Sequence, residues 1–326
     1  MHSTQANSVT DPTAALLAAS SRFGELAARP MLEPPLALHE VGAAISTLCL
    51  EMSRAEAAGS SREGMRELVE NAREIHSQSP FVRRLQTWPR GYPGDWETIE
   101  HLISQENRAT PGTIGFVIEQ YCLATALAQQ HRNKMQRQSK EILGTLLRDD
   151  RKSPPAILVL AAGSAPDVRD AAAFIGSRDC RLVLCDTDPD AVARSEQALA
   201  SLGGRLVTLE GDVVWCSDSI DENGPYDLVV AGGLFDYLDD KWATKTLALV
   251  LNEWLAPGGK LYFTNIAAGN PFRLWMTCVA DWNVIERTEQ DLAKLVSSAR
   301  ASDVSMDIER DATTLAYLVE VALAEA

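Results

Sequence analysis

Small and acidic residues follow the apolar segments in the second half of the chain, where their types and spacing could bind a ligand. One apolar segment leads into a run of small residues that includes Ala161, Gly163 and Ala165, and small side chains let the backbone approach a ligand closely. The next apolar segment ends in Asp186, followed by Thr187. A carboxylate at that point can accept hydrogen bonds from ribose hydroxyls. The alternative is that Asp186 only caps the helix that follows it.

Two further apolar segments end in residues of similar character. Asp212 and Val213 follow the third segment, and an acid beside an apolar residue can hold an adenine ring. The alternative for Asp212 is an acid in a surface turn. The fourth segment opens into Gly232, and Asp236 and Tyr237 come shortly after it.

Regular alternation of short apolar segments with helical ones must position these residues. Such alternation predicts an α/β fold with a doubly wound, largely parallel sheet, and the last two segments predict an antiparallel pair at its end. Ligands bind outside the carboxyl ends of such strands, at the point where the strand order reverses. The expected strands are 156–160, 181–185, 205–210, 228–231, 260–265, 304–310 and 315–322, and the expected helices between them are 167–175, 191–202, 241–255, 272–281 and 288–301.

The first half of the chain has a different pattern. Apolar residues recur there every three or four positions, which is the period of an amphipathic helix. Two consecutive prolines, Pro154 and Pro155, mark a boundary because they disfavour helix. The sequence therefore predicts helices over 36–58, 62–77 and 115–147, a disordered tail over 1–12, an all-helical domain over 13–152 and a sheet domain over 153–326.

Composition excludes several classes of partner. The chain has 326 residues, with 30 Lys or Arg and 45 Asp or Glu, and a net charge of −15. Such a charge repels phosphate backbones and anionic lipids, so we expect neither a nucleic acid nor a membrane as partner. The cysteines and histidines show no metal-binding spacing, so we expect no metal. The first residues lack the basic and apolar segments of a signal peptide, so we expect a cytoplasmic protein.

A stretch before the fifth expected strand completes a family pattern. The residues Leu255-Ala256-Pro257-Gly258-Gly259 end a helix there. Together with the small-residue loop and the acids after strands two and three, they make the chain from residue 156 onward resemble the class I S-adenosylmethionine (SAM)-dependent methyltransferases. The family's acid and two of its three loop glycines are replaced here by Val159, Ala161 and Ala165. The resemblance implies a Rossmann-like sheet, SAM as cofactor, and a SAM site formed by Ala161, Gly163, Ala165, Asp186, Thr187, Asp212, Val213 and Gly232.

A narrower resemblance rests on residues outside this pattern. The segment 90–95, Asn265, the segment 270–276 and Arg287 are similar to a methyltransferase subgroup with an N-terminal helical domain. Members of that subgroup form methyl esters of 3-hydroxy fatty acids, and an arginine N-methyltransferase of N-nitroso natural-product biosynthesis is also similar. Thr277 stands where the ester-forming relatives have an acid. The resemblance implies a helical domain that caps the active site and can form a homodimer.

Four residues are our candidates for contact with the methyl acceptor. Asp236 and Tyr237 follow the fourth strand, and Tyr92 and Asp95 lie in an aromatic-rich loop. An acid in a closed site is costly without a cationic partner, so we expect the acceptor to be a small cation, best a guanidino nitrogen of free L-arginine. One alternative is the carboxyl group of a hydroxy (fatty) acid. The alternative of another class is a non-catalytic SAM-binding scaffold.

Several residues have competing structural interpretations. Arg132, or Arg137 in its place, could bind the carboxylate of SAM, although basic residues on a helix are usually solvated. Tyr92 and Asp95 could serve only the turn chemistry of their loop, whereas the aromatic residues of segment 88–96 favour a lid over the site. Four further residues are expected to be structural, with Asp239 and Asp240 in a solvated turn and helix cap and Trp275 and Trp282 in the core.

Overall fold

The computed structural model describes residues 11–29, 34–148, 153–176, 178–300 and 304–323. The chain divides into two compact units. Among the described helices, none combines the length and the apolar character needed to cross a lipid bilayer. The first unit contains residues up to 94, 105–125 and 271–283, and the second contains 95–104, 126–270 and the residues from 284 onward.

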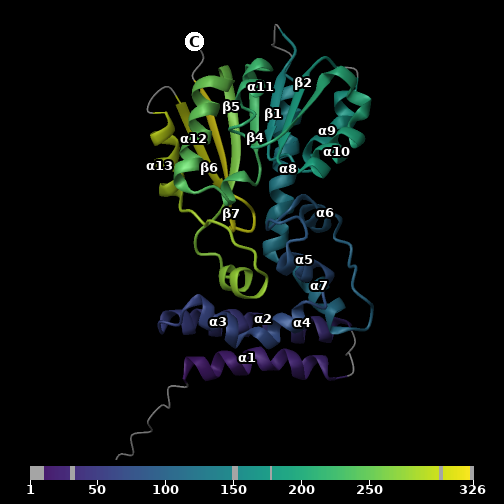
Figure 1. Ribbon diagram of the computed structural model, residues 1–326, viewed down its shortest axis with the longest axis vertical. Helices are drawn as coiled ribbons and strands as arrows, with labels where there is room; N and C mark the ends of the chain where they lie inside the picture. Colours follow the sequence, from purple (N-terminus) through teal and green to yellow (C-terminus); the bar gives the residue numbers. More distant parts are fainter. Residues whose placement is uncertain (1–10, 30–33, 149–152, 177, 301–303, 324–326) are drawn as a thin grey trace, which may run out of the picture. The chain divides into compact units, whose positions relative to one another are not determined.

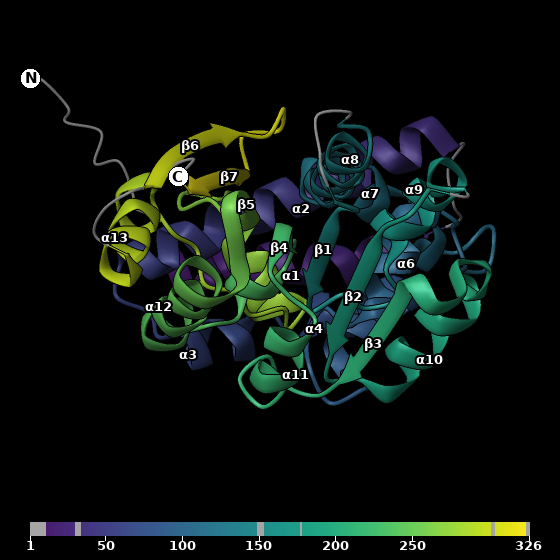
Figure 2. The ribbon, with the colours of Figure 1, turned by 90° about the horizontal axis from the view of Figure 1, so that it is seen from above.

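A seven-stranded sheet forms the centre of the second unit (Figure 2). Its strands are β1 (Ala156–Leu160), β2 (Arg181–Asp186), β3 (Leu206–Glu210), β4 (Tyr226–Ala231), β5 (Leu255–Ile266), β6 (Val304–Arg310) and β7 (Ala316–Leu323). The strand order is β3-β2-β1-β4-β5-β7-β6. The first five strands pair in parallel, whereas β7 is antiparallel to both β5 and β6. The predicted doubly wound sheet with an antiparallel end is confirmed, and its strand order reverses between β1 and β4.

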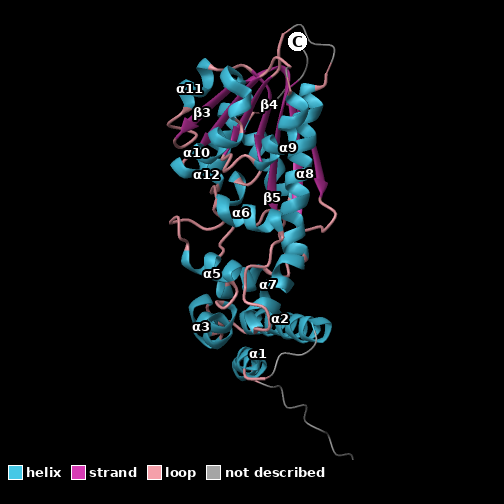
Figure 3. Cartoon of the chain, turned by 90° about the vertical axis from the view of Figure 1, so that its right-hand side faces the viewer, coloured by secondary structure: helices cyan, strands magenta, loops and turns pink. Residues whose placement is uncertain are grey.

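Helices cover both faces of this sheet (Figure 3). They are α8 (Ala126–Leu146), α9 (Pro166–Ile175), α10 (Pro189–Ala198), α11 (Ser217–Glu222), α12 (Asp240–Leu249) and α13 (Glu289–Ala299). Ile157 and Val159 of β1 pack with α8 and α9 on one face. Leu158 and Leu160 pack with α11, α12 and α13 on the other. Because both faces are buried at the centre of the sheet, β1, β2 and β4 are largely continuous apolar runs in the sequence.

Proline and capping side chains define where several of these helices begin. Pro166 and Pro189 occupy the first positions of α9 and α10, where the N–H that proline lacks would have no partner within the helix. Thr288 and Asp291 form a reciprocal capping box at the start of α13. These local signals mark where α9, α10 and α13 begin. The helix expected over 272–281, by contrast, is only the five-residue helical turn Trp275–Val279.

The first unit is helical. Its helices are α1 (Pro12–Ala27), α2 (Pro34–Ala57), α3 (Arg62–Leu68), α4 (Glu70–His76), α5 (Pro80–Thr87) and α7 (Ile114–Ala124). Helix α1 packs on α2 and α4, and α2 packs on α7 (Figure 1). Fully buried side chains such as Leu16, Phe23 and Leu48 form the contact surfaces.

The segment 271–283 belongs to this first unit although it lies between β5 and α13 in the sequence. Asp281 accepts hydrogen bonds from Arg66 and Arg73, each at 2.8 Å. Burial acts to raise the pKa of Asp281, but these two guanidinium groups outweigh it and lower the pKa. Trp275 and Trp282 are 4% and 1% exposed, so their predicted place in the core is confirmed.

The structure corrects the predicted helices at particular residues. The helix expected over 115–147 is two helices, because Thr125 has an extended backbone with ψ of 160° and separates α7 from α8. Val69 likewise divides the helix expected over 62–77 into α3 and α4. Helix α11 had no counterpart among the predicted elements, and its short sequence lies between turn residues.

The division into units also differs from the predicted domains. Helix α6 (Trp96–Ser104) and helix α8 group with the sheet, although the sequence placed them in the helical domain over 13–152. Residues 1–10 of the predicted tail lie outside the described residues, whereas Asp11 caps α1 by accepting the Thr13 N–H at 3.0 Å.

Candidate functional site

The loop after β1 has a left-handed backbone at every second residue. Ala161, Gly163 and Ala165 have φ angles of 49°, 56° and 49°. Glycine adopts this region freely, whereas other L-residues adopt it at a cost of about 1–2 kcal/mol. These are the three positions at which the family pattern has glycine, so the two alanines keep the loop shape that glycines would give.

Helix α6 lies on this loop. A Cβ atom at Gly163 would be 3.1 Å from the Cβ atom of Trp96, so both packing and backbone angle favour glycine there. Glu100 of α6 accepts hydrogen bonds from Ser164 in the loop and from Arg169, the latter at 2.7 Å. Burial acts to raise the pKa of Glu100, but these bonds lower it on balance. A helix from the first half of the sequence therefore forms part of the site.

Asp186, at the end of β2, is fixed beside the same loop. Its Oδ2 accepts the backbone N–H of Gly163 at 2.7 Å, and its Oδ1 accepts that of Asp188 at 2.9 Å. Burial raises the pKa of Asp186 despite these bonds. Each carboxylate oxygen has further lone-pair capacity for a hydroxyl donor. Helix α10 is capped by Asp188, so the interpretation of Asp186 as its cap is wrong.

Asp212 and Val213 lie after β3, next to the end of β2. The Gly211 N–H donates to the Asp186 carbonyl at 2.8 Å, which ties the two strand ends together. Val213 is buried, whereas Asp212 is exposed and accepts the Val214 N–H at 2.8 Å. That bond is the turn chemistry considered above, and it leaves the second carboxylate oxygen for a ligand. The role of Asp212 and Val213 in holding adenine stays a prediction, as does that of the exposed Thr187.

Gly232 directly follows β4 and lies against helix α8. A Cβ atom at Gly232 would lie 2.0 Å from Nε2 of Gln138, so the approach of that amide depends on glycine. The Gly232 carbonyl accepts a hydrogen bond from the Thr264 hydroxyl at 2.6 Å. The face of α8 that carries Gln138 therefore meets the sheet at the point where the strand order reverses.

Asp236 is buried and has its cationic partner within the chain. Its Oδ2 accepts a hydrogen bond from Nζ of Lys134 at 3.1 Å, and its Oδ1 accepts the Ile266 N–H at 2.6 Å. The side chains of Lys134 and Asp236 are each 3% exposed. We predicted a cationic acceptor because the acids near the site had no cationic partner in the sequence pattern. Lys134 is such a partner for Asp236, so Asp236 no longer supports that prediction. Sequence reasoning missed Lys134 because a lysine on an amphipathic helix usually lies in solvent.

Arg287 holds the loop that follows β4. Its guanidinium donates to the carbonyls of Phe235 and Leu238 at 2.7 and 2.6 Å, and to the side-chain oxygen of Asn265 at 2.8 Å. The bonds to the Phe235 and Leu238 carbonyls thus fix the backbone on both sides of Asp236. Tyr237, in the same loop, is 40% exposed. It is more accessible than Asp236, the other residue after β4 that we predicted to contact the acceptor.

Asp239 and Asp240 have the structural roles that the sequence indicated. Asp239 caps α12 by accepting the Trp242 N–H at 2.9 Å. The side chain of Asp240 is 79% exposed and pairs with Arg287 at 2.9 Å. The turn and cap interpretation is confirmed.

The two arginines considered for the SAM carboxylate differ in their surroundings. Arg132 donates to the Leu102 carbonyl at 3.1 Å and to Oε1 of Gln129 at 2.9 Å, and burial lowers its pKa. A guanidinium has five N–H donors, so Arg132 keeps donors for a ligand and its role stays a prediction. Arg137 is surrounded by three carboxylates, those of Glu141, Glu309 and Glu320, and is unsuited as its substitute.

The aromatic segment 88–96 is divided between the two units. Trp88 and Tyr92 belong to the first unit, whereas Asp95 belongs to the second. Asp95 is 2% exposed and accepts the Thr98 N–H at 2.9 Å in the first turn of α6. The acceptor contacts of Tyr92 and Asp95, and the lid over the site, stay predictions.

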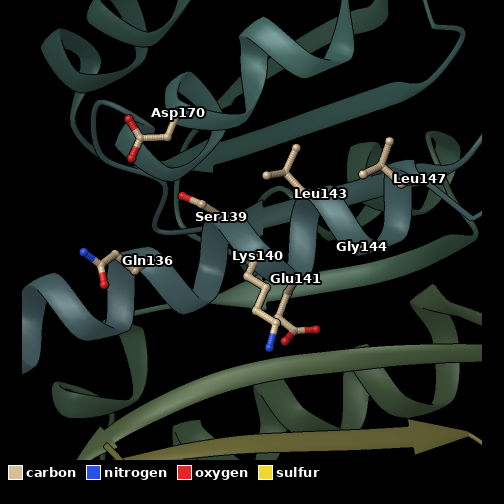
Figure 4. Close-up of a pocket in the computed structure, with 8 residues that line it drawn as sticks. All are labelled: Gln136, Ser139, Lys140, Glu141, Leu143, Gly144, Leu147 and Asp170. Carbon is tan, nitrogen blue, oxygen red and sulfur yellow. The ribbon is translucent and has the colours of Figure 1, made fainter. Parts of the chain in front are cut away.

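Two surface grooves lie away from these residues. One, of about 530 Å³, runs along α8 and α9 and includes Lys140, Glu141 and Asp170 (Figure 4). The other, of about 710 Å³, lies between α1 and α2 and includes His39. Neither is lined by a predicted site residue. Within the described ranges, no group of three or more His, Cys, Asp or Glu side chains is arranged to hold a metal ion.

Comparison with known proteins agrees at the level of the fold. No protein-family model matches the chain, and no curated protein sequence matches it significantly. A structure from Bordetella parapertussis, described as a possible exported protein, has 17% identity and a TM-score of 0.54 over 99% of this chain and 100% of that one. At this identity the likeness shows a shared fold, and it extends over the helical region as well as the sheet.

Solved SAM-dependent methyltransferases are also among the matching structures. The enzyme SibL, in its apo form, has 13% identity and a TM-score of 0.44, covering 97% of this chain and 96% of its own. Magnesium protoporphyrin IX methyltransferase from Synechocystis PCC 6803 has 11% identity and a TM-score of 0.45, covering 62% and 89%. The fold itself rests on the strand order of the chain, which is that of a Rossmann-like sheet with an antiparallel end, and on the helical region that precedes it.

Proposed function

We propose that the chain is a SAM-dependent methyltransferase that acts on a small metabolite. The observation that carries the proposal is the hydrogen bond from the Gly163 N–H to the Asp186 carboxylate at 2.7 Å. It joins a left-handed small-residue loop and a strand-end acid at the carboxyl edge of a doubly wound sheet, beside its switch point. Ligands bind at that point in open α/β sheets.

The residues at this edge suit the parts of SAM. Asp186 would accept hydrogen bonds from the ribose hydroxyls, and Val213 would pack against the adenine. The loop around Gly163 and the end of β4 at Gly232 present small residues to the aminoacyl part. When bound, SAM supplies an electrophilic methyl group on a sulfonium centre. The task of the protein is then to hold the acceptor in line with that methyl group, and such positioning supplies much of the rate.

We retain two acceptor classes, which require different chemistry from the residues after β4. A guanidino nitrogen of L-arginine must lose a proton as it is methylated. Asp236 is engaged by Lys134, so its carboxylate already has a cationic partner within the chain and does not require a guanidino group. A carboxylate already carries a nucleophilic lone pair and needs only to be held. The buried ammonium of Lys134 favours this second candidate, a carboxyl O-methyltransferase acting on a hydroxy acid.

A labelling experiment tests the proposal and separates the two acceptors. The full chain is incubated with SAM carrying a labelled methyl group and, separately, with free L-arginine or 3-hydroxypalmitate. Labelled methylarginine supports N-methylation, and a labelled ester that base hydrolyses supports O-methylation. SAM binding without transfer to any member of a wider metabolite panel would favour a non-catalytic SAM-binding scaffold instead.

A further inference from the structure

One face of α8 carries three buried polar side chains in successive turns. Gln138, Lys134 and Gln130 are 4%, 3% and 0% exposed, and residues four apart lie above one another on the same side of a helix. Gln138 lies against Gly232, at the end of β4. Lys134 pairs with Asp236, which comes four residues after Gly232 in the chain. The row therefore runs outward past the carboxyl end of β4, and Gln130 is its next member.

Gln130 has no hydrogen-bond partner for either end of its side chain. Among the described residues, neither Nε2 nor Oε1 finds a partner, and both atoms are inaccessible to solvent. Native proteins bond nearly all such buried groups, because each one left unsatisfied lowers stability. Lys134 forms its one side-chain hydrogen bond in the described structure to Asp236, and an ammonium has three donors. The two neighbours thus present unused donors from both side chains and one unused acceptor from Gln130.

Other unpartnered buried groups lack such a neighbourhood. The Trp254 N–H and the Tyr262 hydroxyl are also without partners in the described structure, but both side chains belong to the packed layers on the sheet faces. Each offers a single polar atom, whereas Gln130 offers both a donor and an acceptor beside the unused donors of Lys134. The Gln130–Lys134 combination continues the row on α8 that begins beside Gly232 and Asp236.

We propose that Gln130 and Lys134 bind the carboxylate of the methyl acceptor. This assignment rests on the proposed methyltransferase function and defines its substrate class. The Lys134 ammonium and the Gln130 amide N–H donate to the carboxylate oxygens. The Gln130 carbonyl accepts from a hydroxyl or ammonium group close to that carboxylate.

The charge at this subsite selects a monoanion. Lys134 and Asp236 together carry no net charge, so burying a phosphate dianion beside them would cost more than burying a carboxylate monoanion. A carboxylate needs less compensation and also matches the planar amide. The subsite therefore accepts small hydroxy or amino acids, including free arginine, and excludes arginine within a polypeptide, whose carboxyl group is an amide.

Gln130→Met tests this subsite, because methionine has a similar volume and no hydrogen-bonding amide. Binding of L-arginine, L-argininamide and 3-hydroxypalmitate is measured by calorimetry for the full chain, with SAM titrated separately. The wild type should bind at least one of the two acids. If it binds arginine, it should bind argininamide at least about tenfold more weakly. Gln130→Met should lower the affinity for the acid that the wild type binds by about tenfold or more, and should leave the affinity for SAM unchanged. Gln136→Met, at an exposed position of the same helix, should change neither.

Stability provides the readout that a merely structural role would not give. Because Gln130 has no partner, Gln130→Met should keep or raise the Tm, whereas loss of a structural hydrogen bond would lower it. Weakened SAM binding with unchanged acid binding would place the carboxylate of SAM at Gln130 and overturn the assignment. Binding of neither acid by a wild type that binds SAM would also overturn it, whereas a wild type that fails to bind SAM would overturn the proposed function itself.

Discussion

The buried pair of Lys134 and Asp236 gives the sharpest prediction about stability. Its Nζ–Oδ2 distance is 3.1 Å and both side chains are 3% exposed. At an effective dielectric constant of about 20, the attraction at this distance is about 5 kcal/mol. Removing one partner leaves the other charge buried and uncompensated, so Lys134→Met and Asp236→Asn should each lower the free energy of unfolding by about 3–5 kcal/mol.

A double-mutant cycle tests this reasoning. The variant with both substitutions contains no uncompensated charge, and it should be more stable than the sum of the single effects predicts by at least about 1 kcal/mol. Urea denaturation followed by circular dichroism measures all four proteins. The exposed pair Arg22–Glu25, with side chains 40% and 61% exposed, is the control and should couple by less than about 1 kcal/mol. Additive effects of Lys134→Met and Asp236→Asn would refute the pairing and restore Asp236 as a partner for a cationic acceptor.

Three further predictions concern the loop after β1 and the helices around it. Asp167 is 2% exposed and burial raises its pKa from 3.8 to about 6, so its charge destabilises the fold above pH 6 and has no such effect below 3.8. Asp167→Asn should therefore raise stability by up to about 3 kcal/mol at pH 8, and a gain in Tm that did not shrink between pH 6 and pH 4 would contradict this origin. Gly163→Ala should weaken SAM binding because its Cβ would lie 3.1 Å from that of Trp96, whereas Ala161→Gly should not; calorimetry compares the two. A chain restricted to 153–326 lacks α6 and α8 and should fail to bind SAM, and full turnover from it would show that the sheet alone forms the site.

The strands were predictable because their signals are local. The predicted strand 156–160 coincides with β1, since an apolar run bounded by two prolines and a small-residue turn has few other interpretations. The strand-end position of Asp186 followed from the same pattern. The left-handed angles at Ala161 and Ala165 could not be read from the sequence, because alanine ordinarily favours helix.

The remaining features depend on contacts between distant segments. Lys134 and Asp236 are 102 residues apart, and nothing in the local pattern of α8 distinguishes Lys134 from a solvated lysine. Gln130 is hidden for the same reason. The assignment of α6 to the sheet unit depends on Glu100 meeting Ser164 and Arg169, and the assignment of 271–283 to the helical unit depends on Asp281 meeting Arg66 and Arg73.

Calorimetric titration of the full chain with SAM measures whether the loop after β1 and Asp186 bind the cofactor. We expect saturable binding of SAM by the wild type. Asp186→Ala should weaken it by about tenfold or more, since each lost bond to the carboxylate corresponds to ~1.5–3 kcal/mol. Asp190→Ala, at an exposed position in the first turn of α10, should bind SAM as the wild type does. No heat of binding at saturating SAM, or equal affinity of the wild type and Asp186→Ala, would contradict the account.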